Sequence, residues 1–359
     1  MRVAFATDGF FPHSVGGMQR HATLLANALV DLDIEVNVYA PLGHEQGDQR
    51  FRVITLPWPS GRLYPLTLHR WAQRLAPVIA RESYDVVYRQ GLSLGGRVPP
   101  AVAPTIFNPH GLEMFMPASA IETAKGWPLR VAARREARVA SRVISLGGKL
   151  TVIAVKGLGV PRDRVTIIPN GVDPTYFKVD GIERDPRVVL FVGRLFANKG
   201  LDVLCDAALQ LPDDVRVLIV GDGPLRSELE RRYSDPRITF LGGIEEEELR
   251  ALYGKAAVLA LPTRSDGMPT VILEAFCCGT PAVSTDVGAI SELIDDSTGV
   301  LLPRADASLL ADALRRILAL PEAERRAMGL TARARVESRF AWDVVARQTK
   351  ALLEEVVAS

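Results

Sequence analysis

The chain has little cysteine and no long hydrophobic run. Its three cysteines are Cys205, Cys277 and Cys278. The last two are sequence neighbours that cannot easily bridge each other, so no disulfide framework is visible and a reducing cytoplasm fits best. No stretch reaches the ~18 uninterrupted apolar residues that a membrane span needs. Residues 2–7 are too short for a signal peptide and predict a first buried strand. We therefore expect a soluble protein with at most peripheral membrane contact.

The chain also lacks a charge excess of either sign. Lys and Arg total 43 against 42 for Asp and Glu, so the global field gives no reason to expect a nucleic acid partner. Internal repeats and low-complexity tracts are absent as well. What remains is the composition of a globular protein, with 48% apolar and 24% charged residues. At roughly 150 residues per domain, the length of 359 residues favours two domains.

Short apolar runs alternate twice with stretches of helical period, which is typical of βαβ units around parallel sheets. In the first half the pattern predicts strands near 2–7, 34–40, 51–56, 85–88, 104–107 and 164–168, and helices near 17–31, 66–81 and 129–141. In the second half it predicts strands near 187–192, 215–220, 237–241, 256–260, 281–284 and 299–302. The turn dipeptides of Pro169–Pro174 lie between the two series and indicate a domain boundary.

Two loops that follow predicted strands could bind phosphate. Gly16 and Gly17 precede a helix, where they form either a tight turn or an anion site at the helix N-terminus. Arg194 and Lys199 follow a buried strand, and the fork of Arg and the point charge of Lys together suit a diphosphate. The alternative for these two cations is a solvated surface pair.

Two further glycine motifs are weaker. The segment Val220–Arg226 lacks the third glycine of a dinucleotide fingerprint, so a structural turn before Pro224 is favoured over an NAD site. Gly242 and Gly243 close another strand and could flank a base, although a simple turn explains them equally well.

An acidic constellation is the sharpest feature. A loop with Asp266 and Gly267 leads to a helix near Thr270, and Glu274 lies one turn inside that helix. A carboxylate placed there can accept both hydroxyls of a ribose, and a capped amphipathic helix does not explain an acid among Val, Ile, Leu, Ala and Phe. His110 follows a strand end, where it is either a satisfied polar residue or part of a ligand crevice.

In this order, the motifs resemble the retaining glycosyltransferases of the GT-B, family-4 type (glycosyl transferases group 1), over nearly the whole chain. The motifs that carry the resemblance are the glycine pair Gly16–Gly17, His110–Gly111, Ile168–Asp173, Arg194 with Lys199, and Asp266 through Glu274 to Pro281. The resemblance implies an α/β fold with two Rossmann-like, doubly wound parallel-sheet domains facing an interdomain cleft. It implies an acceptor-binding domain of residues 1–173 plus 342–359 and a nucleotide-sugar-binding domain of residues 174–341.

The resemblance also implies the site. Catalytic roles go to His110, Arg194, Lys199 and Asp266. The donor would be held by Gly16, Gly17, Arg194, Lys199, Gly242, Gly243, Asp266, Gly267, Met268, Pro269, Thr270 and Glu274. The nucleoside-diphosphate sugar is a substrate, so no cofactor is implied, and no metal is needed because cations and a helix N-terminus supply its electrostatic role.

The implied reaction is transfer of a sugar, with retention, to a hydroxyl of a saccharide or lipid-linked acceptor in cell-envelope polysaccharide or glycolipid synthesis. One departure from the family is Asp266, which stands where the family has Glu and whose carboxylate is one methylene shorter. A second hypothesis is therefore a catalytically weak, sugar-nucleotide-binding partner of another transferase. An NAD-linked oxidoreductase is disfavoured by the incomplete glycine fingerprint.

Five arginines recur at helical spacing and define a basic arc. They are Arg130, Arg134, Arg135, Arg138 and Arg142. On one helix they would form a face able to meet anionic lipid headgroups, which would place a cytoplasmic enzyme on the inner face of the membrane. The alternative is an ordinary solvated face.

Overall fold

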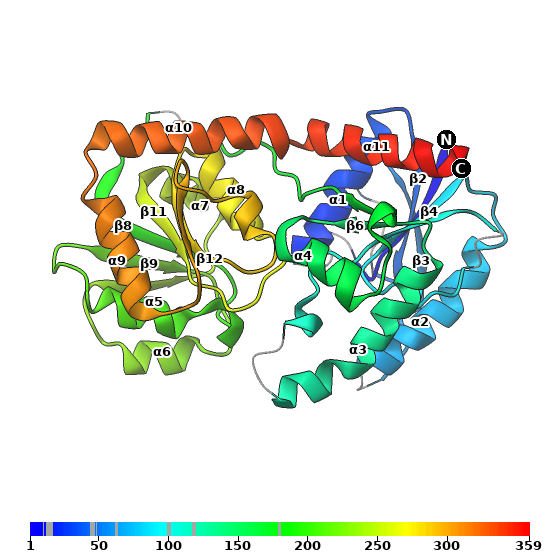
Figure 1. Cartoon of the computed structure of the whole chain (residues 1–359), viewed down its shortest axis with the longest axis horizontal. Helices are drawn as coiled ribbons and strands as arrows, with labels where there is room; N and C mark the ends of the chain where they lie inside the picture. The colour runs from blue at the N-terminus through cyan, green and yellow to red at the C-terminus, as the bar shows by residue number, and fades with distance from the viewer. Residues whose placement is uncertain are drawn as a thin grey trace. The chain divides into compact units, whose positions relative to one another are not determined.

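The computed structural model describes residues 1–9, 11, 17–43, 47, 49–61, 64–98, 102–116, 120–178 and 181–359. The chain divides into two compact units. Unit 1 comprises Met1–Gly171 and Trp342–Ser359, and unit 2 comprises Val172–Ala341. Each unit has its own sheet and its own covering helices (Figure 1).

Unit 1 is a parallel sheet covered by helices. Its described strands are β1 (Arg2–Ala6), β2 (Glu35–Pro41), β3 (Arg52–Leu56), β4 (Val86–Gln90), β5 (Thr105–Asn108), β6 (Arg142–Ser145) and β7 (Val165–Ile167). Its longer described helices are α1 (Gly17–Val30), α2 (Tyr64–Ile79), α3 (Ala120–Val139) and α11 (Trp342–Ala358), with a short helix α4 (Gly148–Val152) after β6. The strand order is β3-β2-β1-β4-β5-β6-β7.

The last helix belongs to unit 1 because its apolar face completes the unit 1 core. Figure 1 shows α11 beside α1, and the two helices are in contact. Val345 and Leu353 of α11 are fully buried in one cluster with Leu25 and Leu29 of α1. Burial of each such side chain contributes about 1.5–3 kcal/mol, so the terminal helix stabilises the sheet that begins the chain.

Unit 2 is a second parallel sheet. Its described strands are β8 (Asp185–Val192), β9 (Arg216–Val220), β10 (Ile238–Gly242), β11 (Ala256–Leu261), β12 (Ala282–Thr285) and β13 (Gly299–Leu302). Its described helices are α5 (Leu201–Ala208), α6 (Arg226–Arg232), α7 (Glu246–Lys255), α8 (Thr270–Cys277), α9 (Ala307–Leu318) and α10 (Glu322–Arg339). The strand order is β10-β9-β8-β11-β12-β13.

In each unit the first and fourth strands lie side by side, and the remaining strands extend outward on either side of this pair. In unit 2 this puts β8 beside β11, with the chain continuing outward to β9 on one side and to β12 on the other. Every residue of β11 is buried, as expected for a central strand with helices on both faces. Ligands of such sheets bind outside the carboxyl ends of the strands at this switch point.

The predicted strands are all present, but the first half contains one more strand than predicted. β6 follows α3 directly, so the interpretation of Arg142 as a helical residue is wrong. The predicted helix near 129–141 actually begins at Ala120 and runs through Pro128. A proline inside a helix removes one backbone hydrogen bond, but here it does not end the helix.

Candidate functional site

The loops that follow β8 and β11 meet at the switch point of unit 2. The backbone N–H of Arg264 donates to the carbonyl of Asn198 at 2.7 Å, and the Asn198 amide donates to the carbonyl of Ser265 at 3.0 Å. The Arg264 guanidinium pairs with Asp202 at 2.6 Å. These bonds fix one loop against the other, so the cations of the first loop and the acids of the second form one platform.

Gly200 allows the close approach of these loops. It has a left-handed φ of 70°, and a Cβ atom there would lie 1.9 Å from the carbonyl oxygen of Pro262. Only glycine fits, because the backbone of the second loop occupies the space of a side chain. This residue was not singled out from the sequence, although the Lys-Gly pair after a strand was its signal.

Lys199 and Asp266 form an ion pair across the platform. The Lys199 Nζ lies 2.5 Å from the Asp266 Oδ2, and the side chains are 19% and 13% exposed. The other Asp266 oxygen accepts the backbone N–H of Gly267 at 2.9 Å. The carboxylate is thus held in place, and a diphosphate that approaches Lys199 must share its ammonium group with Asp266.

Arg194 is exposed, and its guanidinium lies 5.1 Å from the centre of the Phe196 ring. It makes no ion pair with any residue that the structure describes. A cation that packs on a ring at the carboxyl end of a central strand keeps its hydrogen-bond donors free for an anionic ligand.

Glu274 is a buried acid in α8. It is 6% exposed, and it accepts a hydrogen bond from the hydroxyl of Tyr253 at 2.7 Å. Tyr253 lies in α7 and was not found from the sequence, where it has no motif around it. Because a carboxylate can accept about four hydrogen bonds, the Tyr253 bond orients Glu274 and leaves it able to accept more.

The segment between Asp266 and Glu274 packs against the backbone of a third loop, at Gly288 and Ala289. Gly267, Met268 and Pro269 are buried, and Thr270, partly exposed, begins α8. The carbonyl of Gly267 accepts the backbone N–H of Ala289 at 2.8 Å. A Cβ atom on Gly288, which has a φ of 56°, would lie 2.1 Å from the carbonyl oxygen of Asp266. A third loop therefore supports the acidic one, and its glycine was also missed.

Gly242 and Gly243 are not brought into this platform. Gly242 ends β10, two strands away from β8, and its carbonyl accepts the backbone N–H of Gly221 at 2.7 Å. A Cβ atom on Gly223 would lie 2.7 Å from the backbone N of Leu195. Gly242 and Gly223 serve close backbone packing, which is what the structural-turn interpretation of Val220–Arg226 requires. A Cβ atom on Gly243 would have no described neighbour within 4 Å.

In unit 1, His110 lies in a buried cluster with His21. Its φ is 55°, its side chain is 7% exposed, and its ring packs edge-on against that of His21 with centroids 4.5 Å apart. The ring of Trp342 lies 5.2 Å from that of His21. Among the described residues, no hydrogen-bond partner reaches the His110 Nε2 or either ring nitrogen of His21.

Burial lowers the pKa of His110 to about 3, and it lowers the pKa of His21 well below its usual value. Both rings are therefore neutral near pH 7, so His110 can donate or accept a hydrogen bond but does not act as a cation. Gly17 opens α1 in the same unit, and a Cβ atom added there would have no described heavy atom within 4 Å. Gly16 lies outside the described residues.

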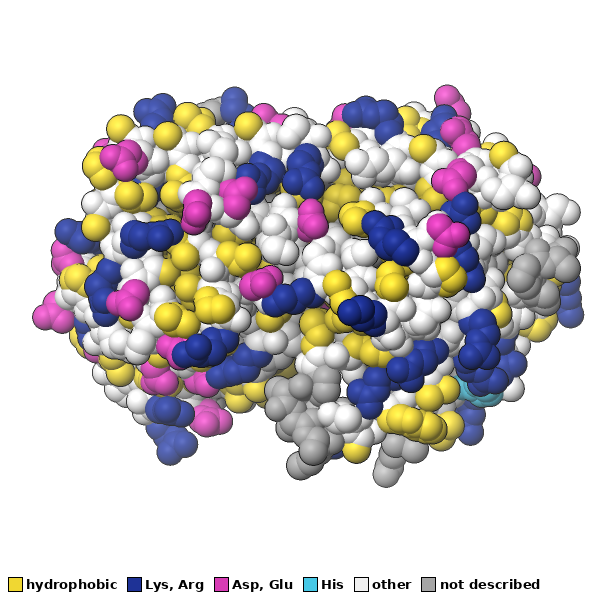
Figure 2. All heavy atoms as spheres, in the orientation of Figure 1, with side chains coloured by type: hydrophobic (Ala, Val, Ile, Leu, Met, Phe, Trp, Pro, Cys, Tyr) yellow, Lys and Arg dark blue, Asp and Glu magenta, His cyan; other side chains and the backbone are white. Residues whose placement is uncertain are grey.

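The basic arc is smaller than predicted. Arg142 lies in β6 and pairs with Glu355 of α11 at 2.6 Å. On α3, Arg130 donates to the carbonyl of Met114 at 2.8 Å and Arg134 to that of Gly157 at 2.9 Å. Exposed Arg135 and Arg138 remain. Lys and Arg side chains gather over the α3 region of unit 1 in Figure 2.

Within the described ranges, no group of three or more His, Cys, Asp and Glu side chains could hold a metal ion. The three cysteines are buried and unpaired, and burial raises the pKa of Cys205 and Cys278 to about 12. No helix in the described part of the chain is long and apolar enough to cross a bilayer.

Two family models match the chain. Glycosyltransferase Family 4 matches residues 15–176, and Glycosyl transferases group 1 matches residues 186–319. Among curated proteins, a GDP-mannose-dependent alpha-(1-6)-phosphatidylinositol monomannoside mannosyltransferase from Mycolicibacterium smegmatis is 28% identical over 92% of this chain and 93% of its own.

Solved structures share the fold. A sucrose-phosphate synthase from Thermosynechococcus elongatus superposes with a TM-score of 0.83 at 24% identity, over 99% of both chains. HepE from Anabaena in complex with UDP-glucose has a TM-score of 0.78 at 21% identity, over 99% of this chain and 100% of its own. These similarities establish the GT-B architecture of two parallel-sheet α/β domains.

Proposed function

Because this chain belongs to the glycosyltransferases of family 4 and group 1, we propose that it moves a sugar from a nucleoside-diphosphate sugar to an acceptor hydroxyl, with retention and without a metal ion. One observation carries the proposal. Lys199, Asp266 and Glu274 come from the loops that follow two adjacent central strands and from the helix that continues the second loop. This combination offers cations to a diphosphate and an acid to a ribose.

Each residue has a proposed role in unit 2. Arg194 and Lys199 neutralise the leaving diphosphate, and the start of α8 presents backbone N–H groups to it. Glu274 accepts the ribose hydroxyls. Asp266, Gly267, Met268, Pro269 and Thr270 border the donor sugar and its phosphate.

Unit 1 is proposed to bind the acceptor, and Gly16 and Gly17 are proposed to contribute to donor binding. His110 offers a neutral imidazole to the transferred sugar, a role suited to a buried ring whose Nε2 has no partner among the described residues. Gly242 and Gly243 are the weakest members of the donor set, since the described bond of Gly242 serves packing of the sheet edge and a Cβ atom on Gly243 would have no described neighbour within 4 Å.

The proposed reaction proceeds through an oxocarbenium-like transition state. The bond between the anomeric carbon and the diphosphate oxygen breaks as the acceptor oxygen bonds to the same face of the sugar. The departing diphosphate takes the proton of the acceptor hydroxyl, so no protein nucleophile is required. Charge grows on the leaving group, and fixed cations beside it lower the barrier.

The relatives suggest donors and acceptors to test. The M. smegmatis relative is named for GDP-mannose and a phosphatidylinositol mannoside, and the Anabaena structure contains UDP-glucose. We propose a nucleotide hexose as donor and a saccharide or glycolipid of the cell envelope as acceptor. The base and the sugar of the donor are therefore the first two variables to screen.

A donor screen tests the proposal. The protein is incubated with GDP-mannose, UDP-glucose and related donors plus candidate acceptors, and released nucleoside diphosphate and product mass are measured. Arg194→Ala and Lys199→Ala should each slow release by roughly 100- to 1000-fold, or about 3 kcal/mol. Arg231→Ala, on exposed α6, is the matched control. If Arg194→Ala and Lys199→Ala both release diphosphate at the wild-type rate, the assignment of these cations to the leaving diphosphate is wrong.

A second candidate function rests on the pairing of Lys199 with Asp266. If this pair holds the ammonium away from the leaving group, the chain binds sugar nucleotides and assists another transferase. Donor binding without diphosphate release, for any acceptor supplied alone, would favour that candidate.

A further inference from the structure

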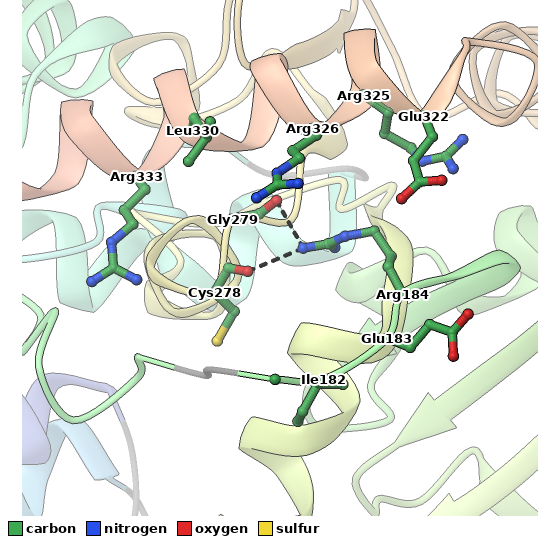
Figure 3. Close-up of a pocket in the computed structure, with 11 residues that line it drawn as sticks. Ile182, Glu183, Arg184, Cys278, Gly279, Glu322, Arg325, Arg326, Leu330 and Arg333 are labelled. Atoms are coloured by element: carbon green, nitrogen blue, oxygen red, sulfur yellow. Dashed lines mark hydrogen bonds between the residues drawn. The ribbon is translucent and has the colours of Figure 1, made fainter.

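Unit 2 contains a cavity of about 430 Å³ that is lined by none of the donor-site residues. Its walls are the segment 181–184, the residues that follow α8 at Cys278 and Gly279, and one face of α10. Figure 3 shows that side chains from α10 face Arg184 across this space. Four arginines line it: Arg184, Arg325, Arg326 and Arg333.

Three of these arginines, Arg184, Arg325 and Arg326, have no counterion among the described residues. Arg325 is 4% exposed and its Nε has no partner among the described atoms, while one terminal nitrogen donates to the carbonyl of Leu320 at 3.3 Å. Neither Arg325 nor exposed Arg326 makes an ion pair with any described side chain. A buried guanidinium destabilises the folded state unless an anion is paired with it. An anion bound in the cavity would supply this partner for Arg325.

Within the described part of the chain, Arg184 is held by neutral groups. Its guanidinium donates to the Thr280 Oγ1 at 2.6 Å and to the carbonyls of Cys278 and Gly279 at 3.1 Å each, the two bonds drawn in Figure 3. Burial and the positive charge of Arg325 both lower the pKa of Arg184. Two like charges therefore face one cavity with no described carboxylate paired to either of them.

The acids of the cavity lie at its rim. Glu183 and Glu322 are exposed, and neither forms an ion pair with a described residue. Arg333 is the exception among the arginines, since it pairs with Glu337 at 2.8 Å. The carboxylates at the rim can accept hydrogen bonds from hydroxyl groups, whereas the arginines of the interior attract an anion.

We propose that this cavity binds the phosphate group of a small, hydroxyl-bearing ligand, with Arg184, Arg325 and Arg326 on the phosphate and Glu183 and Glu322 on the hydroxyls. Guanidinium groups match phosphate oxygens in planar, bidentate geometry. The same chemistry is present in a free phosphorylated polyol and in a glycerophospholipid headgroup. The site is separate from Arg194 and Lys199, so it goes beyond the proposed sugar transfer and does not depend on it.

Thermal unfolding with glycerol 3-phosphate tests the soluble source, against sodium chloride at equal ionic strength. At about ten times the Kd, the melting temperature of the wild type should rise by about 2–4 °C. Arg326→Gln should raise the Kd at least tenfold and so reduce the shift at that concentration to less than about a third of the wild-type value. Arg339→Gln removes one charge from the same helix outside the cavity and should keep the shift.

A double variant tests whether the phosphate binds in the cavity or at the loop that carries Arg194 and Lys199. Arg194→Gln with Lys199→Gln should keep the shift, because those cations lie outside the cavity. If the double variant loses the shift and Arg326→Gln keeps it, the phosphate binds at the donor loops and the proposal is overturned. This outcome leaves the proposed transferase function untouched.

Co-sedimentation with phosphatidylglycerol vesicles tests the lipid source, with phosphatidylcholine vesicles as reference. Vesicle binding that weakens in Arg326→Gln and not in Arg339→Gln supports a headgroup ligand. A shift with glycerol 3-phosphate without Arg326-dependent vesicle binding supports a free ligand. If neither the shift nor vesicle binding depends on Arg326, the proposal is wrong.

Discussion

The Lys199 Nζ lies 2.5 Å from the Asp266 Oδ2, so the cation assigned to the diphosphate already has a carboxylate partner. Asp266→Asn would release the ammonium and remove a charge that repels the diphosphate. We expect affinity for the nucleoside diphosphate to rise roughly three- to tenfold, equivalent to about 0.6–1.4 kcal/mol. Calorimetric titration with the released nucleotide measures this.

Asp202→Asn is the matched control for Asp266. It removes a carboxylate at the start of α5 that pairs with Arg264 of the second loop and forms no described ion pair with Lys199. Its affinity should stay near the wild-type value. Equal or weaker affinity in Asp266→Asn would mean that the pair does not compete with the diphosphate.

The Tyr253 hydroxyl orients the buried carboxylate of Glu274. Tyr253→Phe should lower the free energy of unfolding by about 1–3 kcal/mol, because Glu274 loses a donor inside the protein. It should also raise the KM for the donor if Glu274 holds the ribose. Tyr233→Phe removes a comparable hydroxyl bond, to Asp206 at 2.7 Å, away from the site. Its effect should be confined to stability, and a similar rise in KM would argue against the ribose role.

The histidine cluster predicts a loss of stability in acid. Burial depresses the pKa of His21 and His110 in the folded chain, so below about pH 6.5 the unfolded state binds more protons. Stability should therefore fall as the pH drops below about 6.5, by about 1.4 kcal/mol per pH unit for His110 and by a further amount for His21. Denaturation at several pH values measures the slope.

His21→Leu removes one titrating ring and should make that slope shallower. His69→Gln changes an exposed histidine of the same unit and should leave the slope as it is in the wild type. A His21→Leu slope equal to that of the wild type would show that the cluster is not what senses acid.

Gly200→Ala should be costly because its Cβ would meet the carbonyl of Pro262 and because φ is left-handed. We expect a loss of about 2–3 kcal/mol in unfolding free energy, with weaker donor binding as the two loops separate. Gly243→Ala has no described neighbour within 4 Å of the added carbon and should change stability by less than about 0.5 kcal/mol. Comparable losses in both variants would mean that the close approach does not matter.

The remaining basic face of α3 predicts binding to anionic membranes. Arg135→Gln with Arg138→Gln should weaken co-sedimentation with anionic vesicles, by about 1 kcal/mol per removed charge. Arg142→Gln removes a charge that is paired with Glu355 and should have little effect. Binding that is indifferent to lipid charge would count against a membrane role for this helix.

The sequence predicted the two series of strands because each buried strand is an apolar run bounded by turn residues. It missed β6, whose four residues begin with Arg142, since the arginine continues the helical spacing of α3. Arg194, Lys199 and Glu274 could be found because a cation or an acid beside a buried strand or inside an apolar helix is a local anomaly. Tyr253, Gly288 and His21 carry no such signal.

The sequence by itself determined the fold class, the strand-end position of the cations and acids, and the resemblance to a transferase family. Those features depend on periodicity and order along the chain. Only the tertiary structure decided that Asp266 pairs with Lys199, that Tyr253 holds Glu274, and that His110 is buried against His21. These contacts join residues far apart in sequence, and their distances and burial follow from how strands and helices pack.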